Sequence, residues 1–280
     1  MSRANAGSAG PVAVPDPAAV ADGASSVVRR AGSAHEDDGG PAERAARDLD
    51  RIDWDRVATE LDAHGCAVLR DVLSADECTA LSRSYVDDAL FRSRVVMSRH
   101  GFGRGEYKYF AYPLPPPVAE LRASWYPHLV PIANRWSAEL ARDAEHTVYP
   151  DDHASFVARC HAAGQVRPTP LLLRYTEGDY NCLHQDLYGE HVFPLQVAIL
   201  LSQPGRDFTG GEFVMTEQRP RMQSRPMVLP LGQGDAVVFA VHHRPVQGVR
   251  GVYRVNLRHG VSAVTSGQRH TLGVIFHDAS

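Results

Sequence analysis

The chain has 280 residues, of which 44% are hydrophobic, and a formal net charge of −4 at pH 7. This length can bury one sizeable core, and the negative charge gives no overall basic signature of a nucleic-acid-binding chain. Four cysteines without a C-x-x-C pair argue against a zinc knuckle and a disulfide scaffold. No apolar run approaches the ~20 residues that span a bilayer, and the start of the chain lacks a hydrophobic signal core. We therefore expect a cytoplasmic protein with no membrane partner.

The first 45 residues are rich in Ala, Gly, Ser, Pro and Asp and contain almost no large apolar side chains. Such a segment cannot bury enough apolar surface to offset the entropy of ordering. We therefore expect residues 1–45 to form a disordered tail and the folded part to begin near residue 46.

Residues 46–166 show mostly helical patterns, which predict a region that supports the rest of the chain. A first helix is expected to end at Gly65, because four apolar residues before it fall near one helical face. These residues are Ile52, Trp54, Val57 and Leu61. A short strand is expected in residues 66–73, and Ser74 with Glu77 forms the capping-box pattern that opens another helix.

The sequence pattern changes after Arg167, where the apolar runs become short and rich in β-branched and aromatic residues. Clusters of Gly, Pro, Asp and Gln separate these runs, which are LLLRY, FPLQVAILL, EFVM, AVVFAV, VYRVNL and HTLGVIF. Short strands at this spacing are typical of an antiparallel sandwich or barrel. Residues 167–280 therefore predict an all-β core.

His184 and Asp186 stand one residue apart within this β-rich region. The H-x-D triplet alone is weak, because a chain with 14 histidines should contain about one by chance, and His35–Glu36–Asp37 lies in the predicted tail. In a strand, however, residues i and i+2 point to the same face, so both side chains would aim at one point. Imidazole and carboxylate form two thirds of the facial triad that binds non-haem Fe(II).

The missing ligand must be a second histidine that the fold brings close. Four downstream histidines are candidates, namely His242, His243, His259 and His270. An acidic co-substrate would need a cation, and Arg269 lies ten residues after His259. A turn at residues 265–267 would place these two on adjacent strands of a hairpin, with both side chains in one cavity. His243 with Arg254 is the alternative pair, and its segment HHRPVQGVRG is typical of a loop.

Four motifs in this order resemble the 2-oxoglutarate/Fe(II)-dependent dioxygenase superfamily, in its prolyl-4-hydroxylase-like branch. They are RYTEGDYNCLHQD, TGGEFVM, GDAVVF and HGVSAVTSGQRHTLGVIF, and together they cover roughly residues 170–277. The stretch between the last two motifs is longer than the family pattern. Within the superfamily, the sequence looks closest to a bacterial group classed as nucleic-acid-modifying oxygenases.

The resemblance implies an α+β fold class, in which N-terminal helices support a double-stranded β-helix (jelly-roll, cupin-like) core. It also implies that His184, Asp186 and His259 are the catalytic residues that hold Fe(II). The enzyme would then be a dioxygenase that hydroxylates or oxidatively demethylates its substrate.

The same resemblance implies a binding site for 2-oxoglutarate, with O2 as the second co-substrate. Arg269 would bind the far carboxylate of 2-oxoglutarate, since a guanidinium offers a charged bidentate donor. Tyr175 and Thr271 would add hydrogen bonds from their hydroxyl groups.

Three hypotheses for the function remain open from the sequence. The first is oxidation of a nucleobase, the second is the same chemistry on a protein side chain or small metabolite, and the third is a non-catalytic β-barrel that binds metal or ligand. Residues 203–269 contain nine arginines and four acidic residues, and GFGRGEYKYF at 101–110 mixes basic and aromatic side chains. Such segments suit contacts with a nucleic-acid backbone and bases.

Overall fold

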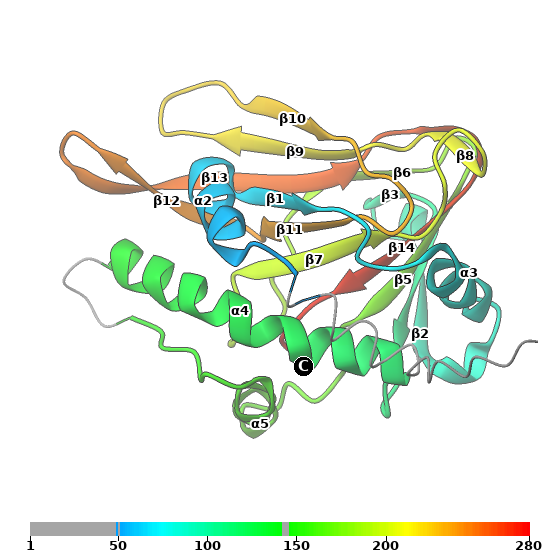
Figure 1. Cartoon of the computed structure of the whole chain (residues 1–280), viewed down its shortest axis with the longest axis horizontal. Coiled ribbons are helices and arrows are strands. Elements are labelled where there is room, and N and C mark those ends of the chain that lie inside the picture. The colour runs from blue at the N-terminus through cyan, green and yellow to red at the C-terminus, as the bar shows by residue number, and fades with distance from the viewer. Residues whose placement is uncertain (1–48, 50, 142–145) are drawn as a thin grey trace, which may run out of the picture. The chain divides into compact units, whose positions relative to one another are not determined.

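Two antiparallel β-sheets packed face to face form the centre of the structure, a computed structural model that describes residues 49, 51–141 and 146–280 (Figure 1). Within these residues, the larger sheet has eight strands, in the order β1-β11-β7-β14-β5-β4-β2, with β8 paired to β14. Their bounds are β1 Cys66–Leu69, β2 Phe91–Val96, β4 Glu106–Phe110, β5 Leu171–Thr176, β7 Leu195–Leu200, β8 Phe208–Gly210, β11 Ala236–Ala240 and β14 Val264–Val274.

The smaller sheet has six strands in the described part of the chain, in the order β10-β9-β13-β6-β3, with β12 paired to β13. Their bounds are β3 Gly103–Arg104, β6 Tyr180–His184, β9 Phe213–Gln218, β10 Arg225–Leu229, β12 His243–Gly248 and β13 Gly251–Val261. From β5 onward the chain passes repeatedly from one sheet to the other, which makes a double-stranded β-helix. The predicted fold class is therefore confirmed.

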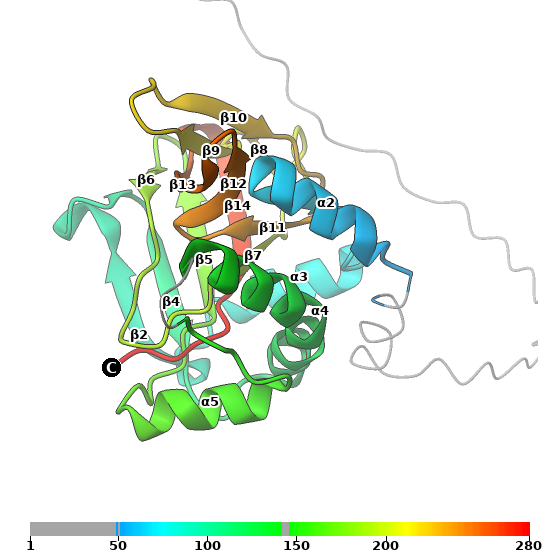
Figure 2. The same cartoon turned by 90° about the vertical axis from the view of Figure 1, so that its left-hand side faces the viewer.

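Helices α2, α3 and α4 lie together on one side of the larger sheet, as Figure 2 shows. The bounds of the helices are α2 Trp54–His64, α3 Ala75–Ser84, α4 Pro116–Ala141 and α5 His153–Ala162, and short 3-10 turns occupy Asp88–Leu90 and Met97–Arg99. Trp125 and Trp136 on α4 are almost fully buried in the core, as expected for a long helix that packs on a sheet. No helix in the described ranges is both long and apolar enough to cross a bilayer.

The local predictions for the first helices are confirmed. Helix α2 ends where Gly65 takes a left-handed backbone conformation as its C-cap. Helix α3 begins with a complete capping box, in which Ser74 and Glu77 each bind the other's backbone N–H. The strand expected in residues 66–73 is present in its first half, as β1.

The supporting region is less purely helical than predicted, because β1, β2 and β4 all join the larger sheet before residue 167. β4 pairs directly with β5, so Glu106 lies opposite Arg174. The boundary at residue 167 stays a prediction, and the predicted tail, residues 1–45, lies outside the described residues.

A buried ion pair ties α4 to the segment that follows β14. Asp278 is fully buried and accepts hydrogen bonds from Arg122 at 2.6 Å, Tyr112 at 2.8 Å and His161 at 2.8 Å. Arg122 also donates to the backbone carbonyl oxygens of Ile275 and Phe276. Burial alone would raise the pKa of Asp278, but Arg122, His161 and Tyr112 hold that pKa below its ordinary value.

We predict that Asp278→Asn lowers the free energy of unfolding at pH 7 by about 1.5–3 kcal/mol, because it removes a charged hydrogen-bond acceptor from buried Arg122. Folding lowers the pKa of Asp278, so its ionised form stabilises the fold at every pH above its ordinary value. That contribution disappears as the pH falls through the lowered pKa, so variant and wild type should converge in acid.

Urea unfolding at pH 7 and at acidic pH measures this difference. The control is Glu60→Gln, which removes an exposed pair with Arg56 and should cost about 0.5 kcal/mol or less. A loss for Asp278→Asn no larger than for the control would contradict the prediction.

Candidate active site

A cavity of about 220 Å³ lies between the two sheets. The larger sheet contributes residues of β4, β5, β7, β11 and β14 to its wall, and the smaller sheet contributes residues of β6, β9 and β13. Most of the wall is aliphatic or aromatic, as at Phe213, Phe239 and Ile275. Polar groups that reach into such an enclosed space are poorly hydrated, so their charge and hydrogen bonding dominate its chemistry.

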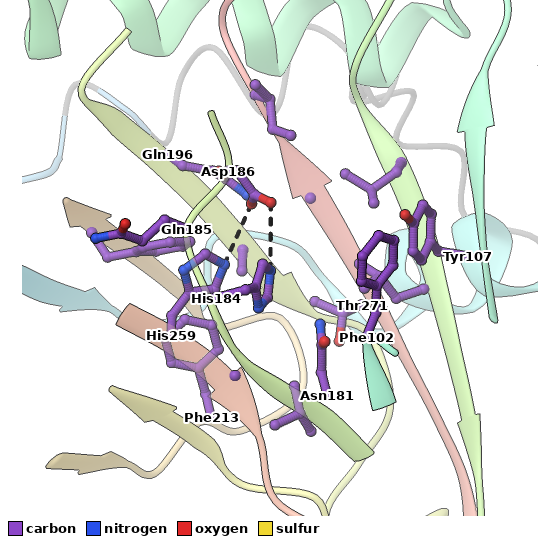
Figure 3. Close-up of a pocket in the computed structure, with 18 of the residues that line it drawn as sticks. Phe102, Tyr107, Asn181, His184, Gln185, Asp186, Gln196, Phe213, His259 and Thr271 are labelled. Atoms are coloured by element: carbon purple, nitrogen blue, oxygen red, sulfur yellow. Dashed lines mark ion pairs between the residues drawn. The ribbon is translucent and has the colours of Figure 1, made fainter. Parts of the chain in front are cut away.

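His184, Asp186 and His259 meet at one wall of this cavity (Figure 3). His184 ends β6 and lies opposite His259 of β13 in the antiparallel pairing, while Asp186 follows two residues after the end of β6. The Nε2 atoms of His184 and His259 each lie 3.4 Å from a carboxylate oxygen of Asp186. One donor atom from each residue lies within 4.8 Å of the others, so the group could hold a metal ion.

Neighbouring groups orient the two imidazole rings. The Nδ1 atom of His184 lies 2.8 Å from the carbonyl oxygen of Cys182, so a proton on Nδ1 leaves the Nε2 lone pair toward Asp186. Phe239 packs against the ring of His259, with 4.5 Å between the ring centroids, and Phe213 stacks on it at 6.0 Å. The rings are thus held before any ligand binds.

The protonation states of this group favour cation binding. Burial would raise the pKa of Asp186, but hydrogen bonds from His184 and His259 hold it well below its ordinary value. Burial lowers the pKa of His259, and the adjacent His184 lowers it further. At neutral pH the site therefore offers an ionised carboxylate and the neutral imidazole of His259, which are the forms that bind metals. Burial would lower the pKa of His184, but its hydrogen bond to Asp186 raises it, so a bound cation would compete with a proton on that ring.

Arg269 lines the same cavity from β14, in the opposite sheet. Its side chain is almost completely buried, its Nε atom has no hydrogen-bond partner among the described residues, and one Nη atom donates to Thr271 Oγ1. Burial lowers the pKa of Arg269 to about 10, so the guanidinium is still charged at neutral pH. Tyr175 lies beside it, and its buried hydroxyl also has no hydrogen-bond partner in the described part of the chain.

The structure therefore brings all six predicted site residues into one cavity, but not by the hairpin that we expected. β13 and β14 belong to different sheets, and the chain crosses between them at Ser262 and Ala263. The predicted turn at Thr265–Gly267 lies inside β14 and pairs with β8. The prediction of adjacent strands was wrong, and the prediction of a shared cavity is confirmed.

The alternative pair of His243 and Arg254 lies elsewhere. Both residues line a second cavity beside α4, together with His242. The segment predicted as a loop forms β12, which pairs with the start of β13. The fourth candidate, His270, faces away from the first cavity and contacts the ring of Tyr85. Among the described histidines, His259 is the one that completes the group with His184 and Asp186.

Several cavity residues were missed at the level of the sequence. The hydroxyl of Tyr188 donates to Asp186 Oδ1 at 2.8 Å, and Tyr107 and Tyr109 line the same cavity with their ring centroids 5.3 Å apart. Burial, and then the charge of Asp186, raise the pKa of Tyr188, so its hydroxyl group stays protonated and can donate the hydrogen bond. Gln196 lies beside Asp186 in Figure 3, and its buried Oε1 has no partner in the described residues. The alternation 184, 186, 188 was a signal that could have identified Tyr188.

Residues 105–279 match the model of a family described as an oxygenase catalysing oxidative methylation of damaged DNA. The chain belongs to this family of oxygenases. Two proteins of Mycobacterium tuberculosis, MT2286 of strain CDC 1551 / Oshkosh and Rv2227 of strain H37Rv, are each 50% identical to the oxygenase over 171 residues. That alignment covers 61% of this chain and 72% of either relative.

The oxygenase is also similar to solved structures at low identity. One is an oxidoreductase of the 2OG-Fe(II) oxygenase family from Burkholderia pseudomallei, with 16% identity, a TM-score of 0.49, and coverage of 82% of this chain and 94% of that one. Another is a Pseudomonas putida prolyl-4-hydroxylase, with 13% identity, a TM-score of 0.46, and coverage of 79% and 96%. The family match confirms that the chain is an oxygenase, and the His–Asp–His group could hold the metal ion that the predicted Fe(II)- and 2-oxoglutarate-dependent chemistry requires.

Proposed function

We propose that this oxygenase oxidises an alkyl group on a nucleobase of damaged DNA, with Fe(II) held by His184, Asp186 and His259 and with 2-oxoglutarate anchored by Arg269. The observation that carries the proposal is a His–Asp–His group, half-buried at His184 and buried at Asp186 and His259, that shares one cavity with a buried arginine whose Nε has no partner among the described residues. A cytoplasmic location, predicted from the sequence, is part of the same proposal.

The three proposed ligands fit Fe(II) in their chemistry and in their arrangement. Two imidazoles and one carboxylate suit a borderline divalent ion and leave coordination positions for other ligands. The Nε2 atoms of His184 and His259 each lie 3.4 Å from a carboxylate oxygen of Asp186. A cation bound between the three side chains would replace these two long contacts. Tyr188 then keeps Asp186 in place through the remaining lone pair of Oδ1.

The pocket around Arg269 fits a carboxylate group. A buried guanidinium without an acidic partner is costly, and a dicarboxylate ligand would supply the missing charge and hydrogen bonds. The unpartnered hydroxyl of Tyr175 lies on the same side and can donate to the same carboxylate. Thr271 holds the guanidinium by accepting a hydrogen bond from it, so we assign it a positioning role.

The chain's own residues bind, orient and exclude water. When bound, Fe(II) with 2-oxoglutarate supplies the oxidation, in which one atom of O2 enters succinate as CO2 leaves, and the other enters a C–H bond of the substrate. An N-methyl group oxidised in this way becomes a hydroxymethyl group, which leaves as formaldehyde. The apolar wall around His259 keeps bulk water from the reacting carbon.

Support for a DNA substrate comes from the family description and from the charges of the smaller sheet. Arg221, Arg250, Arg254 and Arg258 are exposed on or beside the strands of this sheet. The segment RPRMQSRP, noted in the sequence for its arginines, forms the tip of the β9–β10 hairpin. Exposed arginines on projecting hairpins suit contacts with phosphate groups.

A direct test measures two products in parallel. Succinate release from 2-oxoglutarate in air, with Fe(II) and ascorbate, reports the oxygenase chemistry without any substrate. Mass spectrometry of a single-stranded oligonucleotide with one 1-methyladenine reports oxidation of the base. Succinate without oxidised DNA would assign the chemistry to a protein side chain or small metabolite, and neither product with no Fe(II) bound would leave a non-catalytic barrel.

Tyr188 offers a test of the proposed iron site that preserves all three ligands. Tyr188→Phe removes the hydrogen bond to Asp186 and should weaken Fe(II) binding by roughly 10- to 100-fold, as loss of such outer partners does. Equilibrium dialysis under nitrogen measures the affinity, and Tyr180→Phe, an exposed tyrosine of β6, is the matched control. If the two variants bind Fe(II) with equal affinity, the hydrogen bond from Tyr188 to Asp186 does not contribute to Fe(II) binding.

A further inference from the structure

Phe102, which directly precedes β3, forms part of the wall of the cavity. Phe102 lines the cavity and has 46% of its surface exposed to solvent. The backbone beneath it is fixed, because β3 pairs with β6 and the Cys182 N–H donates to the Phe102 carbonyl oxygen at 2.9 Å. Phe102 is thus held beside the strand that carries His184.

This close approach depends on the glycine that follows Phe102. Gly103 has a φ of +127°, and a Cβ at this position would lie 2.4 Å from the carbonyl oxygen of Tyr180. A larger residue would therefore push the segment away from β6. The local sequence keeps an exposed aromatic ring next to the proposed iron site.

The ring of Phe102 stands across the cavity from His184 and His259 and next to Tyr107 and Asn181 (Figure 3). The ring of His100 stacks on it, with 5.3 Å between centroids and 22° between the planes. Phe102 therefore adds a flat aromatic surface to the wall of the cavity. Aromatic rings bind flat groups by stacking.

Other exposed apolar residues flank the proposed iron ligands along the chain. Tyr180 and Leu183 belong to β6, and Leu187 follows Asp186, with exposed fractions of 38%, 43% and 48%. Apolar surface is therefore also exposed in the segment that carries two of the proposed iron ligands.

The charge near β3 indicates an anionic partner. Residues 89–105 contain four arginines and no acidic residue. Arg99 is exposed and makes no ion pair with any residue that the structure describes. Arg104 is also exposed, and its Nε lies 3.8 Å from Asp179. Arg94 pairs with Glu106, so Arg99, and Arg104 with its long contact to Asp179, are the arginines of this segment that a ligand could engage. Proteins bind single-stranded nucleic acid with aromatic and basic side chains, since bases stack and phosphates are neutralised.

We propose that Phe102 stacks on the target base while Arg99 and Arg104 contact the flanking phosphates. This inference rests on the proposed function and names the part of the site that binds the DNA. The cavity volume of about 220 Å³ is below the roughly 300–1,000 Å³ of pockets that enclose whole ligands, and 2-oxoglutarate needs part of it. The nucleotide therefore lies mainly outside the cavity and extends only its reactive group to the iron site.

The test compares two fluorescent single-stranded oligonucleotides of about 12 nucleotides, within the site size of single-strand binders. One carries a 1-methyladenine, and the other has an abasic site at that position. The full-length protein is loaded with Fe(II) and 2-oxoglutarate under nitrogen, so that binding is measured without turnover. Fluorescence anisotropy gives the affinity, and thermal melting of each variant confirms that it is folded.

We expect Phe102→Ala to weaken binding of the methylated oligonucleotide by roughly 5- to 150-fold and to leave the abasic one unchanged. Phe102→Tyr should restore the difference between the two. Val86→Ala, which removes an exposed apolar residue that follows helix α3, is the control and should bind as wild type does. Arg99→Ala should weaken both oligonucleotides alike and reduce the salt dependence by about 0.7 per lost phosphate contact.

Equal affinity of wild type and Phe102→Ala for the methylated oligonucleotide would overturn the stacking role. If mass spectrometry still shows oxidised DNA in that case, the proposed function stands and only the assignment of Phe102 fails. Failure of the wild type to bind either oligonucleotide would overturn the inference, and succinate release would show independently whether the oxygenase chemistry survives.

Discussion

His259→Ala is expected to abolish succinate release, whereas His243→Ala is expected to retain it. Both variants remove one imidazole, but His259 shares the cavity of His184 and Asp186, and His243 lines a separate one. Loss of an outer partner of a metal ligand already costs 10- to 100-fold in affinity. Loss of a ligand itself should therefore lower Fe(II) affinity by more than about 100-fold.

Equilibrium dialysis with Fe(II) and the succinate assay measure the two effects separately. His243→Ala serves as the control, since its ring is half-buried, like that of His184, but lies away from the iron site. Loss of iron and turnover in His243→Ala, with His259→Ala unaffected, would move the iron site to the alternative pair.

Arg269→Ala is expected to raise the KM for 2-oxoglutarate by about 30-fold or more, while Fe(II) binding stays near that of wild type. Truncating one partner of a buried, hydrogen-bonded charge pair costs roughly 2–5 kcal/mol, much of it from the charge left without a partner. Here that charge would be the far carboxylate of 2-oxoglutarate, in a cavity where water cannot replace the guanidinium.

The prediction separates the binding of 2-oxoglutarate, which should weaken, from the binding of Fe(II), which should not change. Arg269→Lys should recover part of the loss, because an ammonium keeps the charge but not the bidentate geometry. Arg258→Ala removes an exposed arginine of β13 and should leave the KM unchanged. A normal KM in Arg269→Ala would place the co-substrate elsewhere in the cavity.

The part of the site that lies within one short segment of the chain could be predicted from the sequence. His184 and Asp186 could be paired because side-chain alternation along an extended segment is a local rule. His259 lies 75 residues further along, and only the pairing of β6 with β13 brings it opposite His184. Local patterns carry no information on that pairing, so His243 could not be eliminated.

The two errors around this site have identifiable physical causes. Gly267 was taken for a turn residue, but its φ of +78° serves a close approach, since a Cβ there would lie 2.1 Å from the carbonyl oxygen of Asp207. Pro245 made its segment look like a loop, yet β12 pairs only with β13 in the described sheet. An edge strand tolerates proline because one side of it needs no hydrogen bonds.

The site is divided between two sheets, since His184 and His259 belong to the smaller sheet and Arg269 to the larger one. The distance from the iron site to the guanidinium is therefore set by how far apart the sheets pack, about 10 Å in such folds. If Arg269 anchors the far carboxylate as proposed, this separation selects keto diacids by length, because a shorter or longer chain could not reach both ends. Core substitutions far from the cavity would then alter the choice of co-substrate by changing how the two sheets pack.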